Sequence, residues 1–416
     1  MNMKNLFIIG FVWPEPNSTA AGSRMLQLVD LFQNNGFTVT FASAASKTKK
    51  SFEFEKLNIQ TFEILLNDLS FDNLVKKINP EVVLFDRFLT EEQFGWRIAE
   101  NCMNAIRILD TEDLHFLRQA RQVAYQNNSD VTLKHLTSDL AKREIASIYR
   151  CDLTLIISKY EMKLLKNTFK IDKSLLLYMP FLLNKINLET LHYYPSFQNR
   201  HHFISIGNFK HEPNWNSVQY LKTVIWPIIR KKLPEAQLHV YGAYPTEKVL
   251  QLHNKKEGFI IKGWAKSAEE VFMNSRVCLA PLLFGAGLKG KLIDAMQYGT
   301  PSITTNIGAE AMHNKLPWNG FIEDNPNEFA LKSVELYTNE NLWKKSRKNG
   351  IKIINTCYSK EKFGKRLLNK IDDIQKNTAK HRLHNFIGAM LLHHTIQSTK
   401  YMAKWIEEKK PRSAKN

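Results

Sequence analysis

Short apolar runs rich in β-branched residues recur along the first half of the chain. They cover residues 6–11, 38–42, 82–85, 106–109 and 153–157. Between the first two runs, apolar residues recur three and four positions apart at Met25, Leu28, Val29 and Phe32. This is the spacing of one helix face, and Gly36 marks the end of the predicted helix. Apolar strands that alternate with helices predict a parallel sheet covered on both faces.

The alternation fades between residues 178 and 199 and then restarts. New apolar runs follow at residues 203–206, 238–241, 259–261, 277–280 and 302–304. We therefore predict an α/β fold with two facing, doubly wound, Rossmann-like domains. The first covers residues 1–180, a linker covers 181–200, and the second covers 201–380.

The last segment, residues 381–416, has a different pattern. Its apolar residues trace one stripe of a long amphipathic C-terminal helix, made of Leu383, Phe386, Ile387, Met390, Leu391, His394, Tyr401, Met402, Trp405 and Ile406. We expect this stripe to pack back on the N-terminal domain.

Composition excludes several classes of protein. With 416 residues, 44% hydrophobic and 24% charged, the chain is neither disordered nor fibrous. The four cysteines lie too far apart for a disulfide framework or a zinc site, which favours reduced thiols in a cytoplasmic protein. No run is long enough to cross a membrane, and the apolar start fits a first strand better than a short signal peptide.

The positive charge is unevenly distributed. The chain has 58 Lys and Arg against 40 Asp and Glu, but 19 of the former and only 5 of the latter lie in residues 341–416. A basic balance confined to the C-terminal part argues against a nucleic-acid-binding protein. It favours either a solvated surface or contact with anionic lipid at the inner face of a membrane.

The strongest local signal is the loop Gly285-Ala-Gly-Leu-Lys-Gly-Lys291, which follows a predicted strand and opens a helix. Gly285, Gly287 and Gly290 allow a ligand to approach the backbone closely. The helix start, with Lys289 and Lys291, favours an anion such as a diphosphate. Asp294 shares a helix face with Lys291 and suits a sugar hydroxyl.

The same glycines also spell a dinucleotide-binding pattern, with Glu310 at the distance expected for a ribose contact. Such a pattern usually opens its domain, whereas this one follows the fourth strand of the second half. A nicotinamide or flavin cofactor is therefore the weaker interpretation, and we expect no cofactor. A glycine-rich turn with solvated lysines is the structural alternative.

Other short segments of the second half carry motifs of the same kind: Ile206-Gly-Asn-Phe209, His211-Glu-Pro-Asn214, Tyr241-Gly242, Asp294-Ala-Met296, Gly299-Thr-Pro301 and Thr305-Asn-Ile-Gly-Ala-Glu310. From about Phe203 to Met312, the chain resembles the donor-binding half of the family 4 glycosyltransferases, which are glycosyl transferases of group 1. The resemblance implies the GT-B architecture of two facing domains. It also implies a metal-independent, retaining transfer of a sugar from a nucleotide-sugar.

On this resemblance, Lys291, Asp294 and His115 are the catalytic candidates. The candidate donor-binding residues are Gly22, Gly207, Asn208, His211, Asn214, Gly285, Gly287, Lys289, Gly290 and Glu310. The sequence departs from the family at Ala286, where many members have the first of two glutamates, and at Ala311, where glycine is usual. Asp294 stands at the position of the second glutamate.

The first domain carries the acceptor side in such enzymes. Gly22, in the loop after the first strand, is expected to touch the donor diphosphate across the cleft. His115 follows another strand and corresponds loosely to a cleft histidine that positions the donor sugar. Asp110 and Asp113 are the nearest thing to a metal pair, and we predict no metal site. Ser158 and Glu161 predict a capping box.

The sequence thus predicts a hexosyltransferase-like enzyme that acts on a glycan or lipid-linked acceptor in cell-envelope polysaccharide or glycoconjugate synthesis. It would be cytoplasmic, or peripheral at the inner face of the membrane. Two alternatives stay open. One is a non-catalytic GT-B scaffold that binds a nucleotide-sugar or a partner enzyme, and the other is a sugar-nucleotide epimerase.

Overall fold

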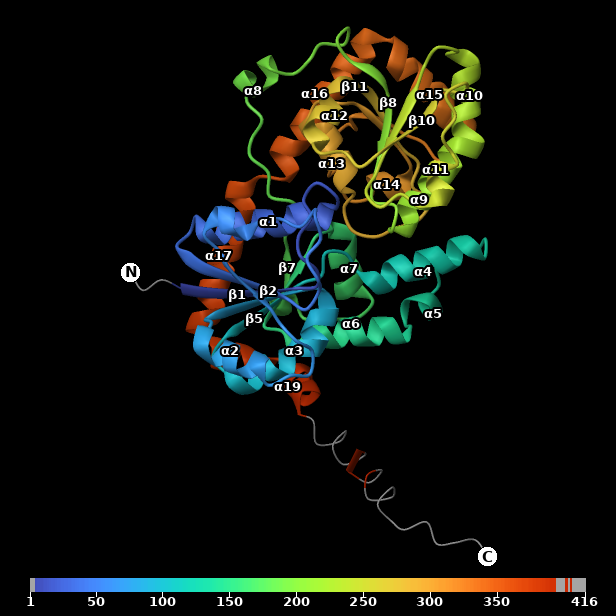
Figure 1. Ribbon diagram of the computed structural model, residues 1–416. Helices are drawn as coiled ribbons and strands as arrows, with labels where there is room; N and C mark the ends of the chain where they lie inside the picture. Colours follow the sequence, from blue (N-terminus) through green and yellow to red (C-terminus); the bar gives the residue numbers. More distant parts are fainter. Residues whose placement is uncertain (1–3, 394–400, 403–404, 406–416) are drawn as a thin grey trace, which may run out of the picture.

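A computed structural model describes residues 4–393, 401–402 and 405. The described chain forms two α/β domains that face each other, connected by a linker that carries α8 (Leu188–His192) (Figure 1). This confirms the predicted two-domain fold. None of the described helices is both long enough and apolar enough to cross a membrane.

The N-terminal sheet has seven strands, all parallel, in the order β3-β2-β1-β4-β5-β6-β7. Their bounds are β1 (Lys4–Gly10), β2 (Phe37–Ser43), β3 (Gln60–Glu63), β4 (Val82–Asp86), β5 (Ile106–Asp110), β6 (Leu153–Ile156) and β7 (Leu176–Tyr178). The helices of this domain are α1 (Ala20–Gln33), α2 (Ser70–Ile78), α3 (Arg87–Asn101), α4 (His115–Gln126), α5 (Leu133–Leu136), α6 (Asp139–Arg150) and α7 (Lys159–Asn167). The strand order reverses between β1 and β4, where ligands bind in open α/β sheets.

The C-terminal sheet repeats this arrangement in the order β10-β9-β8-β11-β12-β13. Its strands are β8 (His201–Ile206), β9 (Leu238–Tyr241), β10 (Phe259–Gly263), β11 (Ser275–Ala280), β12 (Ser302–Thr304) and β13 (Gly320–Ile322). Its helices are α9 (Glu212–Tyr220), α10 (Trp226–Lys232), α11 (Glu247–Leu250), α12 (Ala268–Asn274), α13 (Gly290–Gln297), α14 (Asn306–Ala309), α15 (Pro326–Thr338) and α16 (Glu340–Cys357). The switch point lies between β8 and β11.

The chain then returns to the N-terminal domain through α17 (Lys360–Lys376) (Figure 1). Leu367, Ile371 and Ile374 of α17 are buried in the N-terminal core, against β1 and α1 residues such as Leu6 and Leu28. The predicted boundary at residue 380 is therefore wrong for α17, because the apolar face of this helix packs on the first domain.

The last segment does return to the N-terminal domain where the structure describes it, with Asn385 Nδ2 donating to the Tyr149 carbonyl at 2.7 Å, but the predicted apolar stripe is not the face that docks. The segment forms two short helices, α18 (Thr378–His384) and α19 (Phe386–Leu392), instead of one long helix. Leu383, Phe386 and Met390 are 78%, 74% and 54% exposed. Gly388 lies on the opposite side and packs against the Tyr149 backbone, so the apolar stripe faces outward. Parts of the predicted stripe, including His394 and Ile406, lie outside the described residues.

Candidate active site

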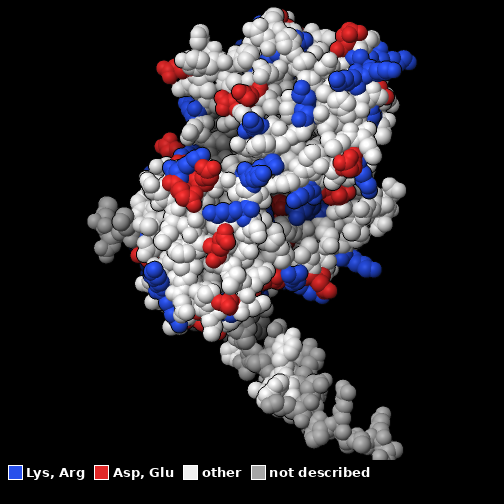
Figure 2. Space-filling model, in the orientation of Figure 1, with Lys and Arg blue, Asp and Glu red and all other residues white. Residues whose placement is uncertain are grey.

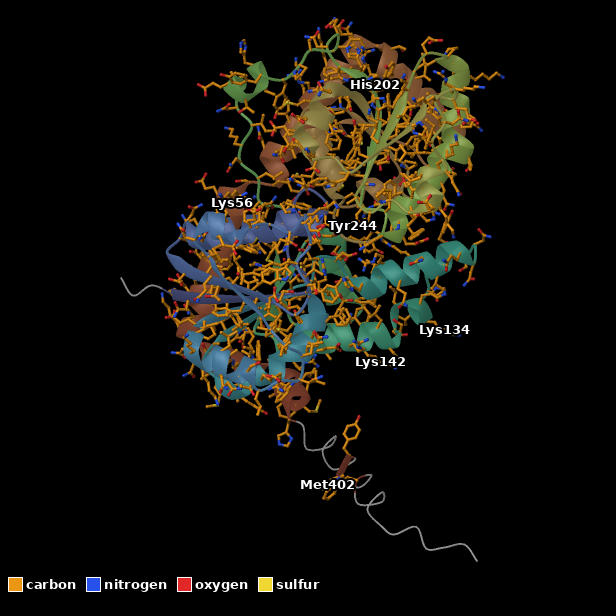
Figure 3. All side chains as sticks on the ribbon, in the orientation of Figure 1. Lys56, Lys134, Lys142, His202, Tyr244 and Met402 are labelled. Atoms are coloured by element: carbon orange, nitrogen blue, oxygen red, sulfur yellow. The ribbon has the colours of Figure 1, made fainter. Side chains whose placement is uncertain are left out.

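A cavity of about 570 Å³ lies between the two domains. The residues that follow β1, β4 and β5 line it from one side, and those that follow β8 and β11 line it from the other. In the orientation of Figure 1, the space-filling view shows Lys and Arg side chains gathered across the middle of the molecule, where the two domains meet (Figure 2). Tyr244, labelled in Figure 3, joins the domains at the rim, where its hydroxyl donates to Glu15 Oε1 at 2.7 Å.

Two helices begin at this cleft. Helix α13 starts at Gly290, and its N-cap residue Lys289 has no side-chain hydrogen bond to the first turn. Helix α1 starts at Ala20, and the domains approach so closely that a Cβ on Gly290 would lie 2.3 Å from the Ala20 Cβ. The uncapped N–H groups of α13 and the positive dipole ends of both helices favour an anion at this point.

Two lysines lie beside the start of α13. Lys291 Nζ donates to Asn214 Oδ1 at 2.8 Å, and Lys289 Nζ donates to the Gly287 carbonyl at 2.9 Å. Burial lowers the pKa of each lysine to about 8. Both ammonium groups are therefore still mostly charged at neutral pH but are poorly solvated, which strengthens their attraction for an anion.

Asp294 follows Lys291 by almost one helical turn on α13 and lines the same cavity. Burial raises the pKa of its carboxyl to about 7. Among the described residues, no donor is within hydrogen-bonding distance of its side-chain oxygens. Asp294 is half-buried, so its oxygens can accept a hydrogen bond from a hydroxyl group of a ligand in the cleft.

The adjacent wall is formed by Gly207, Asn208 and His211 of the loop between β8 and α9, together with Asn214 in the first turn of α9. Asn214 Nδ2 donates to the Asn208 carbonyl at 3.0 Å, while Asn214 Oδ1 binds Lys291. A Cβ on Gly207 would lie 2.7 Å from the Asn214 side chain, so glycine is needed there. Asn214 thus connects this loop to the lysine at the helix start.

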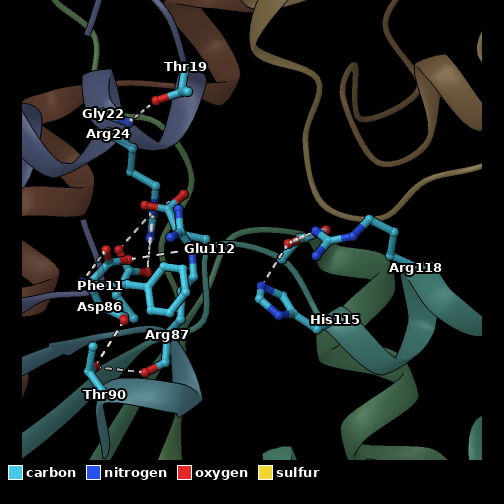
Figure 4. Close-up of polar contacts among 12 residues, drawn as sticks. Phe11, Thr19, Gly22, Arg24, Asp86, Arg87, Thr90, Glu112, His115 and Arg118 are labelled. Carbon is cyan, nitrogen blue, oxygen red and sulfur yellow. Dashed lines mark hydrogen bonds and ion pairs between the residues drawn. The ribbon is translucent and has the colours of Figure 1, made fainter. Parts of the chain in front are cut away.

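The opposite wall, on the N-terminal domain, carries His115, Asp113 and Arg118 (Figure 4). Arg118 Nη1 donates to Asp113 Oδ1 at 2.5 Å, and His115 Nε2 is 3.6 Å from the same oxygen. Burial, together with the charge of Arg118 and against the opposing effect of Asp113, lowers the pKa of His115 to about 4. His115 is therefore a neutral imidazole at neutral pH and is able to hydrogen-bond a sugar hydroxyl.

Of the thirteen predicted site residues, ten line the cavity: His115, Gly207, Asn208, His211, Asn214, Gly285, Lys289, Gly290, Lys291 and Asp294. The structure corrects the prediction for Gly22. Its N–H donates to Thr19 Oγ1 at 3.0 Å, and a Cβ there would lie 2.6 Å from the Glu15 backbone. The Gly22 N–H is therefore used by the Thr19 cap of α1, and Ala20 and Ala21 line the cleft in its place.

The structure also corrects the prediction for Glu310. Its carboxylate is held by Arg121 of α4, with Nη1 to Oε1 at 2.8 Å and Nη2 to Oε2 at 2.7 Å. Arg121 Nη1 also donates to the Gly285 carbonyl at 2.8 Å. Glu310 is thus one half of an ion pair between the domains. The sequence could not reveal this pair, because its partners are 189 residues apart.

Gly287 makes an interdomain contact of a different kind. Its N–H donates to Glu161 Oε1 at 2.9 Å, and the same oxygen accepts from the Leu114 N–H at 3.0 Å. Burial raises the pKa of Glu161 to about 7, although both N–H groups oppose this. Ser158 caps α7 as predicted, but Glu161 does not complete a capping box, because its side chain points across the interface.

Both aspartates considered as a metal pair are bound to arginines. Arg24 Nε and Nη2 contact Asp110 at 3.1 and 2.9 Å, and Asp113 binds Arg118. Within the part of the chain that the structure describes, no group of three His, Cys, Asp or Glu side chains is placed to hold a metal ion. Ala286, which replaces a family glutamate, packs against the N-terminal core.

Comparison with known proteins agrees with this geometry. Residues 200–339 match the family model described as Glycosyl transferases group 1. No curated protein matches the sequence. The matched region contains the loop from Gly285 to Lys291 and the residues around it.

Solved structures share the fold over both domains at low sequence identity. Sucrose-phosphate synthase from Thermosynechococcus elongatus has 14% identity and a TM-score of 0.68, covering 89% of this chain and 99% of that one. HepE from Anabaena, solved with UDP and glucose, has 12% identity and a TM-score of 0.64 over 89% of this chain and 100% of its own. WaaG, described as a glycosyltransferase involved in lipopolysaccharide biosynthesis, has 10% identity and a TM-score of 0.57 over 88% and 99%.

The family match and the two-domain fold confirm the predicted resemblance. Residues 200–339 match glycosyl transferases of group 1, and the two facing α/β domains have the GT-B fold of these solved structures.

Proposed function

We propose that the protein transfers a hexose-like sugar from a nucleotide-sugar to a hydroxyl of a glycan or lipid-linked acceptor, with retention of anomeric configuration and without a metal ion. The observation that carries this proposal is that the uncapped start of α13, Lys291 and Asp294 line one wall of the interdomain cavity. Along this wall, positive charge comes first and a hydrogen-bond acceptor follows. A nucleotide-sugar presents its diphosphate and its ribose in the same order.

In this arrangement the diphosphate binds at the first turn of α13, beside Lys289 and Lys291. The ribose hydroxyls donate to Asp294 one turn further along the helix. The transferred sugar then faces His115 on the N-terminal wall. HepE, whose structure contains UDP and glucose, shares the fold and supports a donor of this class.

The chemistry follows from the charge that develops on the leaving group. As the bond between the anomeric carbon and the phosphate oxygen breaks, negative charge grows on the diphosphate. The lysines and helix N–H groups stabilise this charge without rearranging. The acceptor oxygen forms the new bond to the anomeric carbon, and its proton passes to the departing phosphate oxygen, so no carboxylate base is required.

The first experiment is a thermal-shift screen with UDP, GDP, ADP, CDP and dTDP. A nucleotide at 100 times its dissociation constant should stabilise the protein by about 2.7 kcal/mol. The matching nucleotide-sugars are then assayed for nucleotide release and for transfer, and the anomeric configuration of the product is determined by NMR. Absence of a shift with every nucleotide would contradict the proposal, and an inverted product would contradict retention.

Ala286 favours one competing function, a scaffold that binds the nucleotide-sugar without transferring it. Such a protein would show the thermal shift but no turnover with any acceptor. An epimerase would convert the donor sugar without an acceptor, so analysis of the recovered nucleotide-sugar separates all three functions.

We also propose that the outward-facing C-terminal stripe binds an anionic membrane surface. Leu383, Phe386 and Met390 are exposed, and so is Met103 (71%), whose carbonyl accepts from Arg382 Nη1. Arg382 Nη2, which donates to the Ala105 carbonyl at 2.7 Å, places this surface at the amino end of the N-terminal sheet. The cleft lies at the other end, so the cleft faces away from this surface. Met402, further along, is also exposed (Figure 3).

Vesicle sedimentation tests this surface. The protein should sediment with vesicles that contain anionic lipid, less so at high salt, and not with neutral vesicles. Phe386→Glu should abolish sedimentation, whereas Leu188→Glu, the same change at an 85% exposed leucine of the linker, should not. Equal loss in both variants, or equal binding to both kinds of vesicle, would contradict a membrane role.

A further inference from the structure

An exposed aromatic side chain lies on the N-terminal wall of the cleft, next to the end of β1. Phe11 is 38% exposed and lines the cavity. Its N–H donates to Asp86 Oδ2 at 3.1 Å, and the guanidinium of Arg87 lies 5.2 Å from its ring centre (Figure 4). The backbone hydrogen bond to Asp86 and the contact with Arg87 therefore hold the Phe11 ring in place. The ring presents apolar surface to the cleft.

A carboxyl group with an unsatisfied oxygen lies on the same wall. The side chain of Glu112, at the end of β5, lines the cavity but is only 9% exposed. Its Oε2 is 4.0 Å from Arg24 Nε, whereas its Oε1 is buried and has no hydrogen-bond partner among the described residues. Native proteins rarely leave such an oxygen unpaired, so a ligand that donates a hydrogen bond is expected here.

The backbone is strained at both positions. Arg87 has a φ of +70° and Glu112 a φ of +60°, and neither is a glycine. These residues follow the adjacent strands β4 and β5, so the two strained positions lie at the same edge of the sheet. Strain of this kind persists where the fold holds a side chain in a functional position.

The charges around Glu112 indicate what kind of ligand fits. Asp110 binds Arg24 at 2.9 Å, and Asp86 lies 3.8 Å from Arg87, so both arginines already face a carboxylate. Burial, with a further contribution from Asp110, raises the pKa of Glu112 well above its usual range. Whether Glu112 is ionised or neutral, three carboxyl groups against two guanidinium groups leave no excess positive charge. Within the described residues, both arginines beside Glu112 already face a carboxylate, so a phosphate or carboxylate has no unpaired cation to bind there.

We propose that Phe11, Arg87 and Glu112 form the acceptor subsite and select a neutral pyranose ring. The ring packs on the exposed surface of Phe11, and one of its hydroxyls donates to Glu112 Oε1. This inference rests on the proposed function, in which the donor occupies the opposite wall. It narrows the acceptor to a neutral sugar and excludes an anionic polyol at this position.

Ligand-observed NMR titration of the full chain, saturated with the nucleotide found in the thermal-shift screen, tests the proposal. The probes are the methyl pyranosides of glucose, galactose, mannose and N-acetylglucosamine, with glycerol 3-phosphate as the anionic probe. At least one pyranoside should bind, and glycerol 3-phosphate should not. Phe11→Ala should weaken pyranoside binding about fivefold or more, while Phe11→Tyr, which keeps the ring, should restore it.

Trp96→Ala is the matched control. Trp96 is also 38% exposed, and the Arg97 guanidinium lies 4.4 Å from its ring, but it does not line the cavity. This variant should bind the pyranoside like the wild type. Glu112→Gln should also weaken pyranoside binding relative to the wild type. Its thermal melt with and without nucleotide shows whether the variant is folded.

The outcomes separate this inference from the proposed function. If no nucleotide binds the wild type, the proposed function fails. If nucleotide binds but no pyranoside does, or Phe11→Ala binds the pyranoside as the wild type does, the acceptor subsite alone is refuted. Binding of glycerol 3-phosphate that depends on Phe11 would also overturn it. Nucleotide stabilisation should be the same in Phe11→Ala as in the wild type.

Discussion

Asp294 should lower the stability of the protein at neutral pH while it serves the donor. Its pKa is about 7 in the folded chain, whereas the ordinary value is 3.8. Between these values the unfolded chain is ionised at this position and the folded chain keeps the proton. The stability contribution is therefore complete below about pH 4, falls as pH rises to 7, and is lost above that.

The size of the effect follows from the shift. One pKa unit corresponds to about 1.36 kcal/mol, so the three units involved set a ceiling of about 4 kcal/mol. Because the side chain is partly exposed and lines the open cleft, solvent screens it, and we expect about half of that ceiling. Asp294→Asn keeps the shape and removes the titration, so it should be about 2 kcal/mol more stable than the wild type at alkaline pH.

The same substitution should impair the enzyme. It replaces a charged hydrogen-bond acceptor, which contributes on the order of 1.5 to 3 kcal/mol, and the donor KM should rise about 10- to 100-fold. Stability is measured by urea unfolding across the pH range from about 5 to 8. The free energy of unfolding of the variant, relative to the wild type, should rise by about 1 kcal/mol across this range. The unfolded wild-type carboxyl is ionised throughout, whereas the folded one becomes ionised only near pH 7.

Asp130→Asn is the control, because it makes the same chemical change on an exposed loop. It should change neither stability nor KM. The explanation is refuted if Asp294→Asn is less stable than the wild type at alkaline pH, or if its advantage does not change with pH. An unchanged donor KM would separately refute the ribose contact.

Three further predictions concern the charges at the cleft. Lys291→Ala should lower kcat/KM by about 30- to 1000-fold, a loss of about 2 to 4 kcal/mol of transition-state stabilisation, and wild-type turnover would refute the phosphate site. Arg121→Ala should lower the melting temperature, because it leaves the Glu310 carboxylate unpaired; a double-mutant cycle with Glu310→Ala should give a coupling energy of about 1 to 3 kcal/mol, and additive effects would argue against the ion pair. Activity should survive chelator, since the lysines supply the countercharge; loss of activity that Mg²⁺ or Mn²⁺ restores would contradict metal independence.

The amino-acid sequence by itself determined the two-domain fold and the location of the donor wall. Apolar strands at residues 82–85 and 277–280 are visible because both faces of a parallel sheet are buried, and the structure has strands there. The glycines and lysines of the loop from Gly285 to Lys291 are local signals, since a helix start and its preceding loop are encoded by adjacent residues. Strands β3 and β13 escaped prediction because none of their residues is fully buried, so no continuous apolar run marks them.

Only the tertiary structure decided which side chains meet across the cleft. Glu310 looked like a donor contact, but it pairs with Arg121, and Glu161 spans the interface instead of completing a local cap. The apolar stripe that begins at Leu383 faces outward, because α17 already covers the N-terminal core. Periodicity shows that a helix has an apolar face but does not show what covers that face. Contacts between residues far apart in the chain depend on how two separately encoded domains pack, and no local pattern records that packing.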